Sequence, residues 1–244
     1  MKIYPHGTDI VLPLGRGSKF DNFELRMALR SIERYAVDAG NVYIVSDSAP
    51  PWLKNVHVIS VEDRHLHNKD ANIIDKLMAA AKLPELSEKF VFWSDDQFAM
   101  QPLVLHLLPA VFNRRGAADF NSDKIWHRRM RRTFEYLARQ GIKLEHNFDC
   151  HLPQLMDKKL FCKIMQSVDY TAQPGYCVNT LYFGLAEISG MVAQDNIKTS
   201  IEKCVFLPAM PGGSLFIGCN DDAMLGNLPE LLTGYFPDKS RYEK

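Results

Sequence analysis

The stretch EKFVFWSDDQFAM, residues 88–100, places a short apolar run directly before two adjacent acidic residues, Asp95 and Asp96. A brief run rich in aromatic and β-branched side chains indicates a strand that is buried on both faces. Carboxylates beside such a strand are costly unless they are solvated, paired or bound to a cation. The stretch therefore predicts a buried strand over residues 89–94 that ends either at a polar site or at a solvated turn.

Strand and helix patterns alternate ahead of this stretch. The first helix pattern, residues 21–40, carries a capping-box pair, Asp21 and Glu24, and a stop signal at Gly40. Strands that alternate with helices are typical of right-handed parallel crossovers. We predict an α/β fold, a mostly parallel sheet with flanking helices. The predicted strands cover residues 9–14, 42–46, 55–61 and 89–94, and the second helix covers residues 71–83.

The second half of the chain is less regular. It has helix patterns at residues 122–141, 157–168 and 221–236, and Pro229 is expected to bend the last of these. No repeat, low-complexity segment or Ser/Gly-rich linker divides the chain. We predict a single α/β domain over residues 1–244, in which residues 114–244 pack on residues 1–113.

The composition is that of an ordinary globular protein, with 46% hydrophobic and 24% charged residues. Lys plus Arg and Asp plus Glu both total 29, so the total charge favours no particular partner. No apolar run is long enough to span a membrane, and the first residues lack a signal-peptide pattern, so we predict a cytoplasmic protein. The five cysteines form no CxxC pair, which predicts reduced, mostly buried thiols.

Polar residues follow the ends of the predicted strands. Ligands of open α/β sheets bind beyond the carboxyl ends of the strands, so these side chains are candidates for a site. Carboxylate oxygens suit a hard divalent cation such as Mg²⁺ or Mn²⁺. We predict Asp95 and Asp96 as metal ligands, and a turn with two solvated aspartates is the alternative.

The segment PLGRGS, residues 13–18, follows the first predicted strand and precedes a helix. Its glycines let backbone N–H groups approach a phosphate group, and its arginine adds positive charge. The pattern is neither a P-loop nor a dinucleotide-binding glycine motif, and a plain turn is the alternative. The predicted phosphate-contacting residues are Gly15, Arg16, Gly17 and Ser18.

A histidine lies close to an acidic residue in NFDCHLPQL, residues 147–155. A nearby carboxylate holds an imidazole in one tautomer and makes it a better base. We predict His151 and Asp149 as catalytic residues that take a proton from an acceptor hydroxyl, and a structural histidine is the alternative. The second acidic pair, Asp221 and Asp222, most simply caps the C-terminal helix.

The predicted helix 122–141 is rich in arginine and carries aromatic residues between the arginines. Such a helix can follow a polyanion such as a nucleic acid. The alternative is a solvated helix face, which the balanced total charge favours. The arginines concerned are Arg128, Arg129, Arg131, Arg132 and Arg139.

Several separated segments resemble the Stealth family of sugar-phosphate transferases, which includes capsule polysaccharide phosphotransferases. The most specific part runs from ELRMALRSIERYA, residues 24–36, to SDDQF, residues 94–98. HLPQLMDKKLF, residues 151–161, is similar to the histidine-proline segment of the family, and LPELLTGYFPDKSRYE, residues 228–243, to its closing block. The chain departs from the family at its opening segment, here LPLGRGS, and at Ser94, where the family has asparagine.

The resemblance implies a nucleotide-diphospho-sugar transferase (GT-A-like) core that uses a metal and a uridine-diphosphate sugar. Residues 1–113 would bind the nucleotide sugar, and residues 114–244 would form the acceptor side. Asp95 and Asp96 would then hold the metal and the donor diphosphate, and His151 would act as acid or base. The donor-binding residues implied in addition are Arg26 and Asn72, and we assign Lys76 to the same group.

We therefore predict a metal-dependent transferase that moves a sugar or a sugar-1-phosphate from a nucleoside-diphosphate sugar to a hydroxyl acceptor, a glycan. The same residues serve either reaction, so the bond that is broken stays open. Two alternatives remain. One is a non-catalytic module that binds a nucleotide or glycan, and the other is a glycosyltransferase with a nucleic-acid acceptor.

Overall fold

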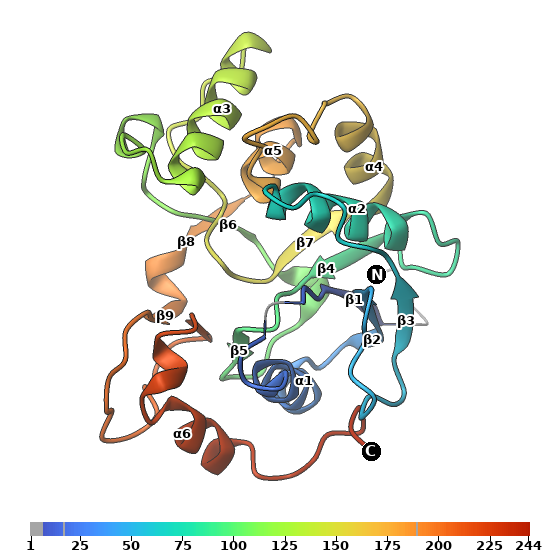
Figure 1. The fold of residues 1–244 in the computed structure, drawn as a ribbon, viewed down its shortest axis with the longest axis vertical. Helices are drawn as coiled ribbons and strands as arrows, with labels where there is room; N and C mark the ends of the chain where they lie inside the picture. Colours follow the sequence, from blue (N-terminus) through green and yellow to red (C-terminus); the bar gives the residue numbers. More distant parts are fainter. Residues whose placement is uncertain (1–6, 17, 189) are drawn as a thin grey trace.

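The main sheet of the protein has five strands in the order β3-β2-β1-β4-β7. The computed structural model describes residues 7–16, 18–188 and 190–244. Strands β1 to β4 pair in parallel, and β7 runs antiparallel to β4 at one edge (Figure 1). This arrangement confirms the predicted α/β fold with a mostly parallel sheet and flanking helices. The strands are β1 (Thr8–Pro13), β2 (Ala39–Ser46), β3 (His57–Ser60), β4 (Lys89–Phe92) and β7 (Gln154–Asp157).

Helices cover both faces of this sheet (Figure 1). Helix α1 packs on one face through apolar residues spaced three and four apart, which include Leu25, Leu29 and Ile32. The opposite face is covered by α2, α4 and α5, which contribute to one shared core. These helices are α1 (Phe23–Tyr35), α2 (Lys69–Ala81), α4 (Lys158–Gln166) and α5 (Val178–Leu185).

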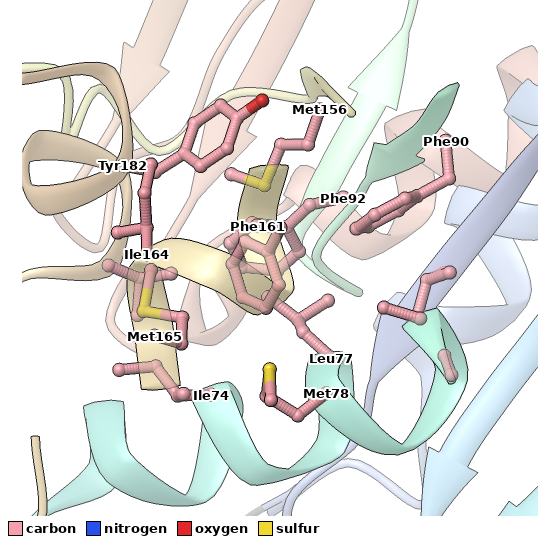
Figure 2. Packing of buried hydrophobic residues seen from close by; sticks show 14 of the residues in the cluster. Ile74, Leu77, Met78, Phe90, Phe92, Met156, Phe161, Ile164, Met165 and Tyr182 are labelled. Atoms are coloured by element: carbon pink, nitrogen blue, oxygen red, sulfur yellow. The ribbon is translucent and has the colours of Figure 1, made fainter. Parts of the chain in front are cut away.

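Strand β4 is buried on both faces, as its sequence predicts. Phe90 and Phe92 belong to the core under α2 and α4, whereas Val91 and Trp93 belong to the core under α1. This alternation follows from the two-residue period of a strand. Figure 2 shows the first of these cores, in which side chains of α2 and α4 face each other next to β4; the labelled residues are Ile74, Leu77, Met78, Phe90, Phe92, Met156, Phe161, Ile164, Met165 and Tyr182.

Two smaller sheets complete the architecture. One has the order β5-β10-β9, and β5 follows β4 directly in the chain, so this sheet lies next to the carboxyl end of β4. Strand β7 belongs to the second half of the chain and pairs with β4. The single domain and its division at residue 113 stay predictions. The remaining elements are β5 (Gln97–Ala99), β6 (Ala110–Phe112), α3 (Ile125–Arg139), β8 (Met191–Ala193), β9 (Lys198–Ile201), β10 (Phe216–Cys219) and α6 (Leu228–Tyr235).

Three local predictions about helix ends are wrong. Helix α1 has no capping box, because its N-cap is Asn22 in a left-handed conformation with no side-chain cap. The helix ends at Tyr35, and Gly40 lies inside β2. Pro229 does not bend a helix, because it occupies the first turn of α6, where a missing N–H costs nothing.

Within the described ranges, no helix is both long and apolar enough to cross a membrane. All five cysteines are free thiols, as expected from their spacing. Three of them, Cys150, Cys177 and Cys219, are buried, and burial raises the pKa of each. Their thiols therefore stay protonated and inert at neutral pH.

Candidate active site

The turn between β4 and β5 carries both predicted metal ligands. Trp93 is fully buried and donates its indole N–H to the carbonyl of Gln97 at 2.9 Å. The side-chain oxygen of Gln97 accepts the backbone N–H of Ser94 at 3.3 Å. These two bonds close the turn around Asp95 and Asp96, which are half-buried at the carboxyl end of β4.

Three carboxyl groups crowd this end of the sheet. Burial, together with the nearby charges of Asp96 and Glu24, raises the pKa of Asp95 to about 7. Burial also raises the pKa of Glu24, which lies in the first turn of α1. Raised pKa values mean that the ionised forms of these carboxyl groups are unfavourable in the folded protein, and a bound cation would stabilise them.

One carboxylate oxygen of Asp96 is bound and the other is not. Oδ2 lies 2.9 Å from Nε2 of His151, whereas Oδ1 is buried without a hydrogen-bond partner among the described residues. A buried oxygen of this kind is costly unless a cation or water binds it. In the part of the chain that the structure describes, no three His, Cys, Asp or Glu side chains form a complete metal site. Asp95 and Asp96 thus fit a cation such as Mg²⁺ that completes its coordination with phosphates and water.

His151 lies in the loop that precedes β7 and has a left-handed backbone conformation, with φ of 53°. This conformation costs roughly 1–2 kcal/mol for a residue with a side chain. The residue that we predicted as its partner, Asp149, instead accepts the backbone N–H and the hydroxyl of Thr180 at 2.9 and 2.5 Å. The pairing of Asp149 with His151 is therefore wrong, because Asp149 turns toward the first residues of α5. The carboxylate that contacts His151 is Asp96.

Asp149 makes the stability of the fold depend on pH. Burial raises its pKa from 3.8 to about 6, so the folded chain keeps a proton that the unfolded chain has lost between these values. The free energy of unfolding therefore falls as pH rises from about 4 to 6. Asp149→Asn lacks the ionisable group and should not lose stability in this way. From pH 4 to pH 7, its free energy of unfolding should therefore rise by about 2–3 kcal/mol relative to that of the wild type. Urea denaturation across this range measures the difference.

The matched control is Asp238→Asn, because Asp238 is exposed. Its unfolding free energy should follow that of the wild type at every pH. If the difference between Asp149→Asn and the wild type stays constant from pH 4 to 7, Asp149 does not carry this proton.

The loop after β1 is held by its own side chains. Ser18 Oγ accepts the backbone N–H groups of Asn22 at 2.9 Å and Phe20 at 3.3 Å, and it donates to Glu24 Oε2 at 3.3 Å. Arg16 is exposed and pairs with the carboxylate of Asp47, which follows β2. Gly17 lies outside the described residues. The loop thus lies at the carboxyl edge of the sheet, and phosphate binding by Gly15, Arg16, Gly17 and Ser18 stays a prediction.

The three other predicted donor-binding residues contact the chain itself. Asn72 forms two hydrogen bonds with the backbone of His65. Lys76 is buried and donates to the carbonyl of Leu14 at 2.8 Å, and it pairs with Asp63 at 2.6 Å. Since Leu14 follows β1 and Asp63 follows β3, Lys76 joins two strand ends on the side where the candidate site lies. The assignment of Asn72 and Lys76 to donor binding stays a prediction.

Arg26 lies on α1, and its guanidinium stacks over Trp52 at 4.0 Å and reaches Glu243 Oε2 at 3.3 Å. Glu243 has no exposed side-chain surface and also accepts two bonds from Arg30, at 2.8 and 2.9 Å. Burial would raise the pKa of Glu243, but Arg30 and Ser240 lower it to about 2. The structure thus uses Arg26 and Arg30 to fasten the end of the chain to α1, and donor binding by Arg26 stays a prediction.

Sequence reasoning missed the place of Glu24 in the site. Glu24 shares the buried face of α1 with Met27, Ala28 and Ser31, at positions three, four and seven residues further on. A glutamate on the buried stripe of a helix is expensive, and this signal was available in the sequence. We interpreted the residue as half of a capping box instead.

Asp221 and Asp222 do not cap a helix through their side chains. The turn after β10 is capped by Asn220, whose Oδ1 accepts the backbone N–H of Ala223 at 3.1 Å. Asp221 pairs with Lys19 at 2.7 Å, and its charge contributes to the raised pKa of Glu24. Asp221 therefore lies near the cluster formed by Glu24, Asp95 and Asp96, and the capping prediction is wrong.

Three of the arginines of α3 bind the chain itself. Arg129 is buried, pairs with Asp70 at 2.7 Å and donates to two backbone carbonyls. Arg131 donates to the carbonyls of Phe120 and Ser122, and Arg132 stacks over Tyr176 at 4.4 Å. These cations hold neighbouring loops, so they lend no support to a surface that follows nucleic acid.

The fold is similar to that of a solved glycosyltransferase structure. Over 97% of this chain, the structure is similar to that of the galactosyltransferase LgtC in complex with donor and acceptor sugar analogs, with a TM-score of 0.53, 11% sequence identity and coverage of 98% of that chain. The chain therefore has a GT-A-like fold, and the predicted fold class is confirmed.

Sequence comparison gives more particular relatives. No protein-family model matches the chain. It is 32% identical over 87 residues to the exopolysaccharide phosphotransferase CpsY of Mycobacterium leprae and 28% identical over 107 residues to a capsular polysaccharide phosphotransferase of Neisseria meningitidis serogroup B. These matches cover 33% and 39% of this chain but only 16% and 28% of the two relatives. They confirm the resemblance to polysaccharide phosphotransferases over the matched part.

Proposed function

We propose that the chain is a metal-dependent nucleotide-sugar transferase. It moves a sugar or a sugar-1-phosphate from a nucleoside-diphosphate sugar, a UDP-sugar, to a hydroxyl group of a glycan. The GT-A fold supports a nucleotide-sugar donor. The similarity to exopolysaccharide and capsular polysaccharide phosphotransferases supports polysaccharide synthesis as the process.

The observation that carries this proposal is the meeting of Asp95, Asp96 and His151 at the carboxyl end of β4. Asp95 and Asp96 would hold Mg²⁺ or Mn²⁺, which neutralises the donor diphosphate when it is bound. Asp96 has one oxygen for His151 and a second, buried oxygen that is free for the cation. A single carboxylate thus links the donor side of the site to the proton-accepting group.

His151 would take the proton of the acceptor hydroxyl. Because Nε2 faces Asp96, Nδ1 is the ring nitrogen that can accept this proton. In phosphotransfer, the hydroxyl oxygen bonds to the phosphorus of the sugar phosphate, the pyrophosphate linkage breaks and a nucleoside monophosphate leaves. In glycosyl transfer, the oxygen bonds to the anomeric carbon, the sugar–oxygen bond breaks and a nucleoside diphosphate leaves.

The test of the proposal is incubation with a panel of nucleotide sugars, Mn²⁺ and glycan acceptors, with the released nucleotide as the readout. We expect a monophosphate or a diphosphate to appear, and its identity tells which bond breaks. Metal-enhanced binding without release of either product would overturn the proposal in favour of a binding module. An oligonucleotide in the acceptor panel tests the alternative of a nucleic-acid acceptor, since such transfer would weaken steeply with salt.

Replacement of His151 by alanine should lower turnover about 100-fold, because general bases contribute factors of this size. Donor affinity should stay within about twofold, because the metal ligands remain. The matched control is His57→Ala, since His57 lies at the amino end of the edge strand β3. Equal losses of turnover and donor affinity in His151→Ala would indicate a structural histidine instead.

A further inference from the structure

We infer that Lys198 is a positioning residue for His151, and that Gly218 makes room for it. Lys198 lies on β9 and Gly218 on the neighbouring strand β10. This inference rests on the proposed function only in that His151 is assigned a catalytic role there. The arrangement itself is a property of the free protein.

The ammonium group of Lys198 binds the peptide that precedes His151. Its Nζ donates to the carbonyl oxygen of Cys150 at 2.9 Å. The side chain of Cys150 is buried, and its Sγ donates to the carbonyl of Val111 at 3.2 Å. Cys150 is therefore fixed by its side chain on one side and by its carbonyl on the other.

This fixed peptide precedes a residue with an unfavourable backbone conformation. His151 has a φ of 53°, which residues other than glycine rarely adopt unless the surroundings impose it. The conformation brings the imidazole to Asp96, with 2.9 Å between Nε2 and Oδ2. The hydrogen bond from Lys198 to the carbonyl of Cys150 fixes the plane of the peptide bond between Cys150 and His151. The φ of His151 is the rotation that follows this peptide bond. Lys198 thus has the position needed to impose the conformation.

The absence of a side chain at Gly218 leaves space for the end of the Lys198 side chain, which would have to shift if a Cβ were added. A Cβ at this position would lie 2.7 Å from Cε of Lys198 and 3.5 Å from the carbonyl oxygen of His151. Its φ lies outside the left-handed region, so an alanine could adopt the same backbone. The glycine therefore opens the path by which Lys198 reaches Cys150.

The electrostatic setting gives the cation a second effect. Burial of the side chain lowers the pKa of Lys198, and the nearby charges of Glu202 and Asp96 partly oppose this effect. A positive charge at this place offsets part of the negative charge of the cluster around Asp96. Lys198 therefore acts on both partners of the contact between Asp96 and His151. It positions the imidazole through the backbone of Cys150, and it stabilises the Asp96 carboxylate through its charge.

The first measurement is the NMR spectrum of the imidazole nitrogens in ¹⁵N-histidine-labelled protein, at a pH where the ring is neutral. In the wild type, the Asp96 contact should hold His151 in the tautomer that carries the proton on Nε2. Lys198→Ala should give signals averaged over both tautomers. Lys203→Ala is the matched control, because Lys203 is exposed just beyond β9, and it should leave the signals unchanged. The signals are assigned with His151→Ala.

The second measurement is a double-mutant cycle with Gly218→Ala. Alone, Gly218→Ala should displace Lys198 and cause the same tautomer averaging. In the Lys198→Ala background it should add nothing, because the clashing side chain is gone. Where transfer activity is measurable, Lys198→Ala should lower turnover about 10-fold with unchanged KM for the donor.

Unchanged His151 signals in folded Lys198→Ala would overturn the inference. So would a Gly218→Ala effect that appears in full in the Lys198→Ala background. If Lys198→Ala does not fold, Gly218→Ala alone decides, since it keeps the lysine in the chain. If no nucleotide sugar is consumed at all, the proposed function fails, whereas the NMR signals still test the role of Lys198.

Discussion

Replacing both Asp95 and Asp96 with asparagine should abolish metal-dependent donor binding and lower turnover by at least about a thousandfold. Asparagine keeps the shape of the side chain and removes its charge, so the cation loses two anionic ligands at once. The fold should survive, because burial and neighbouring charges raise the pKa of Asp95 to about 7, which means that its ionised form is unfavourable in the folded state. Calorimetric titration with Mn²⁺ and UDP, together with the product assay, measures both effects.

Two controls make this result specific. Asp238→Asn removes an exposed carboxylate and should leave binding and turnover unchanged. A chelator added to the wild type should reproduce the loss, and restored Mn²⁺ should reverse it in the wild type but not in the double variant. Metal-dependent donor binding that persists in a folded double variant would place the cation elsewhere.

The largest expected effect on stability comes from Arg129→Met. Arg129 pairs with Asp70 at 2.7 Å, and both side chains are largely buried, with 9% and 17% exposed. Removal of the cation leaves Asp70 buried without a counter-charge and leaves the carbonyls of His67 and Pro174 without their donor. Breaking a buried pair in this way costs about 3–5 kcal/mol. Urea denaturation should show a loss of this size.

The neighbouring arginine provides the control for this variant. Arg128 is exposed on the same helix, and Arg128→Met should change the unfolding free energy by no more than about 0.5 kcal/mol. Adding Asp70→Asn to Arg129→Met should recover part of the loss, because the uncompensated charge is then gone. If Arg128→Met and Arg129→Met change the unfolding free energy equally, the pair of Arg129 and Asp70 does not stabilise the packing of α3.

The fold could be predicted from sequence because its signals are local. The apolar runs that form β1, β2 and β4 are continuous, and the stripe of Leu25, Leu29 and Ile32 fixes the buried face of α1. The helix ends were less predictable. A capping box depends on which residue is the N-cap of the helix. In α1 the N-cap is Asn22, and composition does not reveal its left-handed backbone.

The candidate site could be predicted only in part for the same reason. Asp95 and Asp96 follow the end of a buried strand after two intervening residues, so their place at the sheet edge is a local property. The partner of His151 is not local, because the turn after β4 reaches it from another part of the chain while Asp149 turns toward Thr180. No sequence pattern indicates a role for Lys198, because that role depends on the contact of its side chain with the loop before β7.

The ion pair between Arg30 and Glu243 has a consequence for folding during synthesis on the ribosome. The two residues are 213 positions apart, so Arg30 on α1 is synthesised long before Glu243. Contacts of such long sequence separation are slow to form and come late in folding. The closing segment can dock onto α1 only after it has been synthesised, which is later than all strands of the main sheet. Until then, Arg30 lacks the carboxylate that it binds in the folded protein.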